Sequence, residues 1–86
     1  MEKVEIFTRD YCGYCTMAKR LLDQNNVTFT EYNASKDPTF RDVMIKRSGR
    51  RTFPQVFIGK VHVGGADDLA AFTRAGKLQP ALAGEV

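Results

Sequence analysis

Apolar and polar positions follow two different periods along this chain, and the changes of period divide its first third into predicted elements. Residues 4–8 are rich in β-branched and aromatic side chains, which favours a strand. Asn25-Asn26 is a stop signal for the helix expected next, and residues 27–32 alternate as a second strand, parallel to the first. The apolar side chains that recur at helical spacing between the two strands are Tyr14, Met17, Ala18, Leu21 and Leu22.

The middle of the chain predicts a second helix that starts near Pro38. Asp37 is placed as an N-cap, and proline favours the first helical position. Ser48-Gly49 ends the helix, because glycine adopts the left-handed conformation without penalty. The apolar stripe expected on this helix consists of Phe40, Val43 and Met44.

The last third predicts a hairpin followed by a helix. Residues 56–58 and 61–63 are short apolar runs separated by Gly59-Lys60, the length of a tight hairpin turn. Residues 66–68 open a third helix with two acids that complement the helix dipole. The apolar residues expected to pack from this end of the chain are Leu69, Phe72, Leu78 and Leu82.

Length and composition restrict the class of protein. A chain of 86 residues is the size of one domain, which we place at residues 1–86. Its 43% hydrophobic and 27% charged residues are ordinary for a soluble globular protein, and no apolar run is long enough to span a membrane. The first residues lack the pattern of a secretory signal, so we expect a cytoplasmic protein with no membrane partner.

The formal net charge of +3 is concentrated in the middle of the chain. The basic cluster consists of Lys46, Arg47, Arg50 and Arg51. Three explanations are a solvated basic face, a site for a small anionic ligand, and a nucleic-acid surface. No helix-turn-helix, zinc-finger or aromatic-basic pattern accompanies the cluster, so nucleic acid is not an expected partner.

The two cysteines of the chain are separated by two residues, in Cys12-Gly13-Tyr14-Cys15. They fall at a predicted strand-to-helix turn, where unpaired N–H groups and the helix dipole favour an anion. In such motifs a thiol pKa of about 3.5–7.5 replaces the usual value of about 8.5. Cys12, at the open entrance of the helix, is the predicted nucleophile, and Cys15, one turn further in, is placed to attack a disulfide formed on Cys12.

Other interpretations of the cysteine pair are weaker. A structural disulfide across so short a loop restricts the unfolded chain little. A zinc site needs four ligands, and His62 is the one histidine in the chain, so metal binding by the pair is not expected. We assign no catalytic role to His62. Redox catalysis is the favoured prediction for Cys12 and Cys15.

Three motifs in this order resemble the glutaredoxins, in particular the small dithiol bacterial type. They are Cys12-Gly13-Tyr14-Cys15, Thr52-Phe53-Pro54 and Gly64-Gly65-Ala66-Asp67-Asp68. The resemblance extends over nearly the whole chain. It implies an α/β thioredoxin-like fold, with a four-stranded mixed sheet flanked by three or more helices in the order β-α-β-α-β-β-α.

The resemblance also implies a glutathione site around the cysteines. Its members in this chain would be Arg9, Tyr14, Thr52, Phe53, Pro54, Gly65, Ala66 and Asp67. In this fold the proline that faces the cysteines is cis, and the backbone of the preceding residue pairs with an incoming peptide as an added strand. That residue is Phe53 here, where the family more often has valine.

The charges of glutathione indicate a role for each end of this site. Free N–H groups at the start of the third helix suit the γ-glutamyl carboxylate, and an aspartate suits the ammonium. The resemblance implies that the backbone of Ala66 and the side chain of Asp67 have these roles. The family often has cysteine or serine at position 66, so this chain lacks that side chain's contribution. Arg9 occupies the position where glutaredoxins usually have lysine or arginine, so the resemblance implies that it faces the glycine carboxylate, and a second cation could come from the basic cluster. Tyr14 either flanks the bound peptide or belongs to the core.

By this resemblance the chain is a glutathione-dependent thiol-disulfide oxidoreductase. Cys12 alone would reduce glutathione mixed disulfides, and Cys15 would resolve protein disulfides such as that of ribonucleotide reductase. Glutathione is then the co-substrate of a monomer that needs no organic cofactor. One alternative is a glutaredoxin-like thioredoxin reduced by a flavoprotein, which the glutathione motifs disfavour. The other is a carrier of a 2Fe-2S cluster between two protomers, with Cys12 as ligand, because Gly13 replaces the proline usual in the motif.

Overall fold

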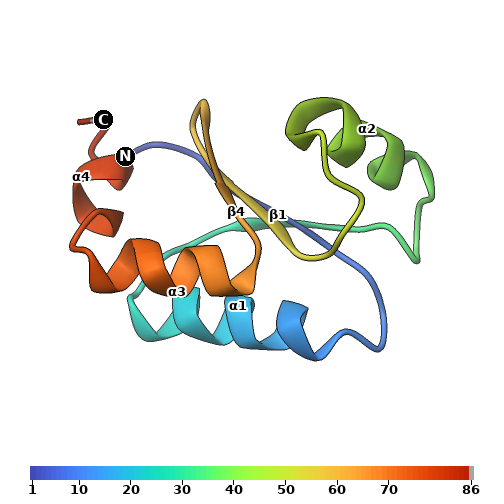
Figure 1. Cartoon of the computed structure of the whole chain (residues 1–86), viewed down its shortest axis with the longest axis horizontal. Helices are drawn as coiled ribbons and strands as arrows, with labels where there is room; N and C mark the ends of the chain where they lie inside the picture. The colour runs from blue at the N-terminus through green and yellow to red at the C-terminus, as the bar shows by residue number, and fades with distance from the viewer. Residues whose placement is uncertain (86) are drawn as a thin grey trace.

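The computed structural model describes residues 1–85 and contains the predicted elements with one short helix added at the end (Figure 1). The elements are β1 (Val4–Thr8), α1 (Gly13–Gln24), β2 (Thr30–Asn33), α2 (Thr39–Ser48), β3 (Gln55–Ile58), β4 (Val61–Gly64), α3 (Ala66–Arg74) and α4 (Leu78–Leu82). None of the helices in the described part of the chain is long and apolar enough to cross a membrane.

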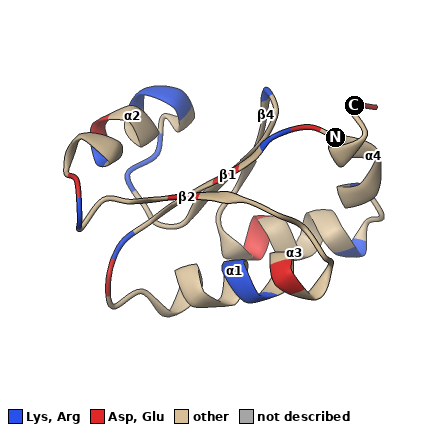
Figure 2. Cartoon of the chain, turned by 180° about the vertical axis from the view of Figure 1, so that it is seen from behind, with Lys and Arg blue, Asp and Glu red and all other residues tan. Residues whose placement is uncertain are grey.

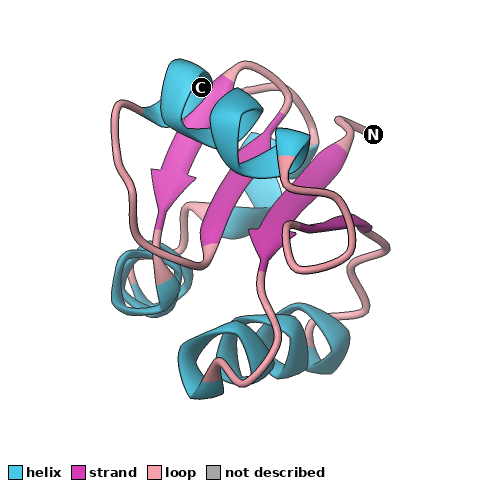
Figure 3. Ribbon diagram, turned by 90° about the vertical axis from the view of Figure 1, so that its right-hand side faces the viewer, coloured by secondary structure: helices cyan, strands magenta, loops and turns pink. Residues whose placement is uncertain are grey.

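The four strands form one mixed sheet in the order β2-β1-β3-β4. β1 pairs with β2 in parallel, and β3 pairs with both β1 and β4 in antiparallel fashion. α1 and α3 lie side by side on one face of the sheet, and α2 covers the opposite face (Figures 1 and 3). This arrangement confirms the predicted thioredoxin-like architecture.

The sheet has a core on each face because successive side chains of a strand point in opposite directions. Ile6 and Val56 belong to the larger core, which α1, α3 and α4 cover with buried residues such as Leu22, Leu69 and Leu82. Phe7 and Phe57 point the other way and form a smaller core with Met44 of α2. Both central strands are therefore apolar on both sides, and the helices are held at fixed positions along the sheet.

The second strand is shorter at its start than predicted. The expected strand covered residues 27–32, whereas β2 begins at Thr30, where β1 first offers a partner, Glu5. Val27 is used differently, because its N–H bonds the carbonyl of Leu22 and its side chain is buried in the larger core. Residues 27–29 therefore connect α1 to the sheet.

The second helix confirms the predicted stop and corrects part of the predicted stripe. Gly49 ends α2 in the left-handed conformation, at φ 71°. The predicted N-cap is wrong by one residue, because α2 begins at Thr39 and Pro38 occupies the N-cap position. Asp37 lies just before it, and its Oδ1 accepts the N–H of Thr39 at 3.0 Å. Val43 is wrong as a buried core residue, because it lies at the edge of the smaller core, where it lines a hollow with Phe7 and Tyr32 and keeps 45% of its surface exposed. Ile45 packs on the smaller core in its place.

Candidate active site

Cys12 occupies the N-cap position of α1, at the turn between β1 and the helix. Its backbone is extended, with φ −125° and ψ 102°, and its Sγ accepts the N–H of Cys15 at 3.2 Å. A hydrogen-bond acceptor at this position satisfies a free helical N–H and lies at the positive end of the helix dipole. The sequence prediction of a sulfur at the helix entrance is confirmed.

The two thiols differ in how deeply each is buried. Cys12 is more enclosed than the open entrance that we expected, with 9% of its surface exposed, because the carbonyl of Phe53 lies 3.9 Å from its Sγ. Cys15 is more deeply buried, at 2%. Burial, helped by a hydrogen bond to the Cys12 thiol group, raises the pKa of Cys15 to about 12. Cys15 therefore stays protonated at neutral pH.

A groove of about 170 Å³ lies beside the cysteine turn. Its lining comes from three segments that are distant in the sequence: the start of α1, the loop before β3 and the start of α3. The lining residues are Tyr14, Arg50, Thr52, Phe53, Pro54, Gly65, Ala66, Asp67 and Asp68. The structure thus brings together every predicted glutathione residue except Arg9 and adds Arg50 and Asp68.

The wall of the groove next to Cys12 has the backbone form that the resemblance implied. The Phe53–Pro54 peptide bond is cis. Phe53 is half-buried and packs on the smaller core, so its backbone faces Cys12 while its ring supports the wall from behind. Tyr14 is 60% exposed, which rules out the alternative that it belongs to the core.

The two acids at the start of α3 differ in their contacts. The Oδ2 of Asp68 accepts the N–H of Gly65 and the Nη1 of Arg50, both at 2.9 Å. These two donors hold the pKa of Asp68 below its ordinary value. Asp67 is exposed and lines the groove, and no donor within residues 1–85 bonds its carboxylate. Asp68 is therefore the structural cap of α3, whereas Asp67 is free to meet a ligand.

The basic residues divide into separate roles. Figure 2 shows Lys and Arg gathered at the end of α2 and in the loop after it, and Arg50 is the member of that cluster that lines the groove. Arg47 instead bonds Glu5, with Nη2 2.9 Å from Oε1, and lies 4.2 Å from the ring centroid of Phe57. The hydrogen bond from Arg47 lowers the pKa of Glu5.

Arg9 lies in the loop before the cysteine turn and is absent from the groove lining. Its Nη1 donates to the carbonyl oxygens of Asp10 and Tyr11, at 3.1 Å each. These bonds fix the loop that leads into Cys12. Binding of a carboxylate by Arg9 stays a prediction.

Two further features around the site were not found from the sequence. Tyr11 is fully exposed next to Cys12 and has φ 54°, a conformation that non-glycine residues rarely adopt. Gln55 is buried, donates to the carbonyl and hydroxyl oxygens of Thr52 at 3.1 Å, and bonds His62 at 2.7 Å. Gln55 and His62 therefore support the groove wall from behind. Nothing in the sequence indicated the backbone conformation of Tyr11 or the hydrogen bonds of Gln55.

The side chains of the described residues do not form a complete metal site by themselves. Within residues 1–85, no group of three or more His, Cys, Asp or Glu residues could hold a metal ion. A 2Fe-2S cluster would need ligands beyond this chain. The cluster-carrier alternative therefore stays an untested prediction.

A mixed sheet with a Cys-x-x-Cys pair at the N-terminus of its first helix, facing a cis-proline, defines a thioredoxin-like thiol-disulfide oxidoreductase. The sequence profile of the glutaredoxin family matches residues 4–63. The chain therefore belongs to the glutaredoxin family.

Individual relatives support this assignment over nearly the whole chain. The chain is 48% identical to Glutaredoxin 3 of Escherichia coli K12 over 82 residues, covering 95% of this chain and 99% of that protein. It is similar to the solution structure of glutaredoxin from Brucella melitensis, with a TM-score of 0.82 and 52% identity over 95% of this chain and 89% of that one. A buckwheat glutaredoxin solved as a glutathione complex has a TM-score of 0.86 and 33% identity, covering 95% and 77%.

Proposed function

We propose that this glutaredoxin is a glutathione-dependent oxidoreductase that reduces both glutathione mixed disulfides and protein disulfides. The observation that carries the proposal is the groove beside Cys12, whose lining contains all but one of the residues that the glutaredoxin resemblance assigns to glutathione. The glutathione complex of the similar buckwheat protein supports the same ligand. Glutathione serves as co-substrate rather than as a resident cofactor.

Charged groups along the groove complement those of glutathione. The N–H of Ala66, in the first turn of α3, binds the γ-glutamyl carboxylate, because free N–H groups and the helix dipole favour an anion there. Asp67 receives the neighbouring ammonium. Arg50 is the basic residue of the groove wall and adds positive charge for the carboxylates, although its pairing with Asp68 offsets part of that charge. The peptide backbone of glutathione lies along Phe53.

The reduction of a glutathione mixed disulfide needs Cys12 alone. The Cys12 thiolate attacks the glutathione sulfur, the substrate's sulfur–sulfur bond breaks, and the substrate leaves as a thiol after taking up a proton. The N–H of Cys15, 3.2 Å from the Cys12 sulfur, stabilises the thiolate before attack. A second glutathione thiolate then attacks the enzyme-bound glutathione. Glutathione disulfide forms and Cys12 is restored, so one glutathione thiol is consumed for each mixed disulfide, whose own glutathione supplies the other half of the product.

The reduction of a protein disulfide also uses Cys15. Cys12 forms a mixed disulfide with one substrate sulfur, and Cys15 attacks the Cys12 sulfur from inside the helix. The burial that raises the pKa of Cys15 keeps its proton in place until this step, when the proton passes to the departing substrate sulfur. The substrate leaves with both sulfurs reduced, and the protein holds a Cys12–Cys15 disulfide. Two glutathione molecules reduce that disulfide in turn.

Single cysteine variants test the division of roles. We expect Cys15→Ser to retain reduction of a small glutathione mixed disulfide and to lose reduction of a protein disulfide. Cys12→Ser should lose both activities, because Cys15 is buried and protonated. Both rates can be followed as NADPH oxidation coupled through glutathione reductase. A Cys12→Ser protein with full activity toward either substrate contradicts the assignment.

A further inference from the structure

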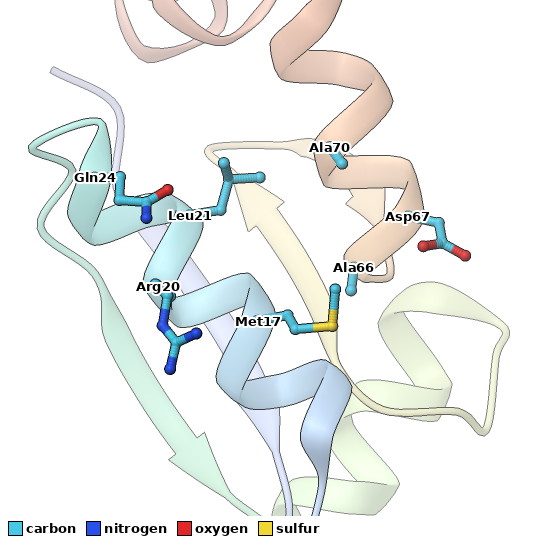
Figure 4. A pocket seen from close by; sticks show the side chains of 7 residues that line it. All are labelled: Met17, Arg20, Leu21, Gln24, Ala66, Asp67 and Ala70. Atoms are coloured by element: carbon cyan, nitrogen blue, oxygen red, sulfur yellow. The ribbon is translucent and has the colours of Figure 1, made fainter.

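A second cavity adjoins the glutathione groove and has no part in the mechanism above. It measures about 280 Å³ and lies between α1 and α3 (Figure 4). The residues that line this α1–α3 cavity are Met17, Arg20, Leu21, Gln24, Ala66, Asp67 and Ala70. Ala66 and Asp67 also line the groove, so the two hollows meet at the start of α3.

The α1–α3 cavity is apolar between the helices and polar at its edge. In Figure 4 the side chain of Met17 extends from α1 toward Ala66, and Leu21 lies one turn further along the same helix. Arg20, Gln24 and Asp67 supply the polar edge. An apolar centre with a polar rim is the composition of a protein-binding surface.

Exposed apolar side chains near the cysteines also indicate a binding surface. The large hydrophobic residues exposed in the described chain are Met1, Tyr11, Tyr14, Met17 and Val43. Tyr11 and Tyr14 flank Cys12 in sequence, and Met17, 55% exposed, follows one turn later. Exposed apolar side chains gathered in one segment of the chain are typical of interaction sites, and the flexible methionine side chain adapts to different partners.

The distance from Cys12 fits an extended peptide. Met17 and Leu21 lie about 7.5 Å and about 13.5 Å beyond Cys12 along the axis of α1, at a rise of about 1.5 Å per residue. An extended peptide advances about 3.3–3.6 Å per residue. Side chains about two to four residues from a substrate cysteine therefore reach the cavity. Glutathione has no apolar side chain to place there.

We propose that the α1–α3 cavity is a subsite for protein disulfide substrates and binds an apolar side chain located two to four residues from the attacked cysteine. The inference rests on the proposed function, since it assumes that the peptide passes along the groove beside Cys12. Apart from Ala66 and Asp67, which it shares with the groove, the residues of the cavity act on the protein-disulfide route and contribute nothing to the binding of glutathione mixed disulfides.

The test pairs one variant with two peptide disulfides. Met17→Gln removes the apolar side chain and retains helix propensity. Val43→Gln is the matched control, because it removes another exposed hydrophobic residue from the opposite face of the sheet. The two peptides differ only at the positions three residues before and three residues after one of the disulfide cysteines. One peptide has leucine at both positions and the other has glutamine. A small glutathione mixed disulfide serves as the third substrate.

We expect Met17→Gln to raise the KM for the leucine peptide about fivefold, since about half of a methionine side chain is available for burial. The KM for the glutamine peptide and for the small mixed disulfide should stay unchanged, and Val43→Gln should match the wild type throughout. An unchanged KM for the leucine peptide, or an equal rise for all three substrates, overturns the inference and leaves the proposed function standing. Wild-type protein that is inactive toward the mixed disulfide overturns the proposed function itself.

Discussion

The adjacent aspartates at the start of α3 should differ in what their substitution changes: Asp68 should affect the stability of the fold, and Asp67 the binding of glutathione. Asp68→Asn keeps the size of the side chain but removes the charge that Gly65 and Arg50 share. Asp67→Asn removes an equal charge one residue earlier, from a carboxylate that no donor in the described chain bonds. The pair therefore separates the stabilisation of the helix terminus from the binding of glutathione.

The magnitude for Asp68 follows from its two contacts. The amide oxygen of asparagine still accepts the N–H of Gly65, so the substitution removes only the charge at the helix terminus, which contributes about 0.5 kcal/mol. The ion pair with Arg50 adds about 0.5 kcal/mol, because both side chains are about half exposed, at 48% and 50%. The sum of about 1 kcal/mol corresponds to a decrease in Tm of roughly 4–8 °C in a domain of this size. Asp67→Asn should change the Tm by less than about 3 °C.

The pKa of Asp68 gives this prediction a pH dependence. A carboxyl whose pKa is lower in the folded state stabilises the fold above its unfolded pKa of about 3.9, and the contribution disappears as the pH falls through the folded value. The difference in Tm between wild type and Asp68→Asn should therefore be complete at neutral pH and should vanish in acid below both pKa values.

The assays are thermal unfolding followed by circular dichroism, and steady-state turnover of a glutathione mixed disulfide. Asp67→Asn should raise the KM about tenfold, the lower end for loss of one charge-assisted contact, because the side chain is exposed. Equal decreases in Tm for the two variants would refute the structural distinction. An unchanged KM for Asp67→Asn would remove Asp67 from the glutathione site.

Two further substitutions test other parts of the structure. Arg47→Gln should lower the free energy of unfolding by about 1–2 kcal/mol at pH 7, through loss of the Glu5 pair and the contact with Phe57. Because Arg47 lowers the pKa of Glu5, this difference should decrease as the pH falls below 4.5, and a constant difference in urea unfolding contradicts it. Gly13→Pro should raise stability by about 0.4–1 kcal/mol and retain turnover, because Gly13 is the first residue of α1 and Cys12 already has the extended backbone that precedes proline. If the wild type binds a cluster on anaerobic reconstitution with iron, sulfide and glutathione, Gly13→Pro should bind it more weakly. A Gly13→Pro protein that is less stable than the wild type, or that binds the cluster more strongly, contradicts this account.

The order of elements was predictable because each carries a local signal. Helical spacing from Tyr14 to Leu22, the Gly59-Lys60 turn and the Gly49 stop all depend on neighbouring residues, and the structure contains each of them. The start of β2 was not predictable in this way, because it depends on where β1 offers a partner. The exposure of Val43 was not predictable for a similar reason, since apolar spacing identified the side of α2 that meets the sheet but not the edge of that side that stays uncovered.

The site was predictable as a set of residues but not as a set of contacts. Spacing and resemblance selected the residues that line the groove. The enclosure of Cys12 depends on Phe53, and the selection of Arg50 from the basic cluster depends on Asp68. Both contacts join segments that are distant in the chain, and only the folded sheet brings them together.

The central claim is that glutathione is the electron donor for this dithiol. The most direct test measures NADPH oxidation with a glutathionylated substrate in two parallel reactions, one with glutathione and glutathione reductase and the other with thioredoxin reductase alone. We predict rapid turnover in the first reaction, saturable in the mixed disulfide and abolished by Cys12→Ser, and none above background in the second. Turnover through thioredoxin reductase, with no activity in the glutathione system, would contradict the claim.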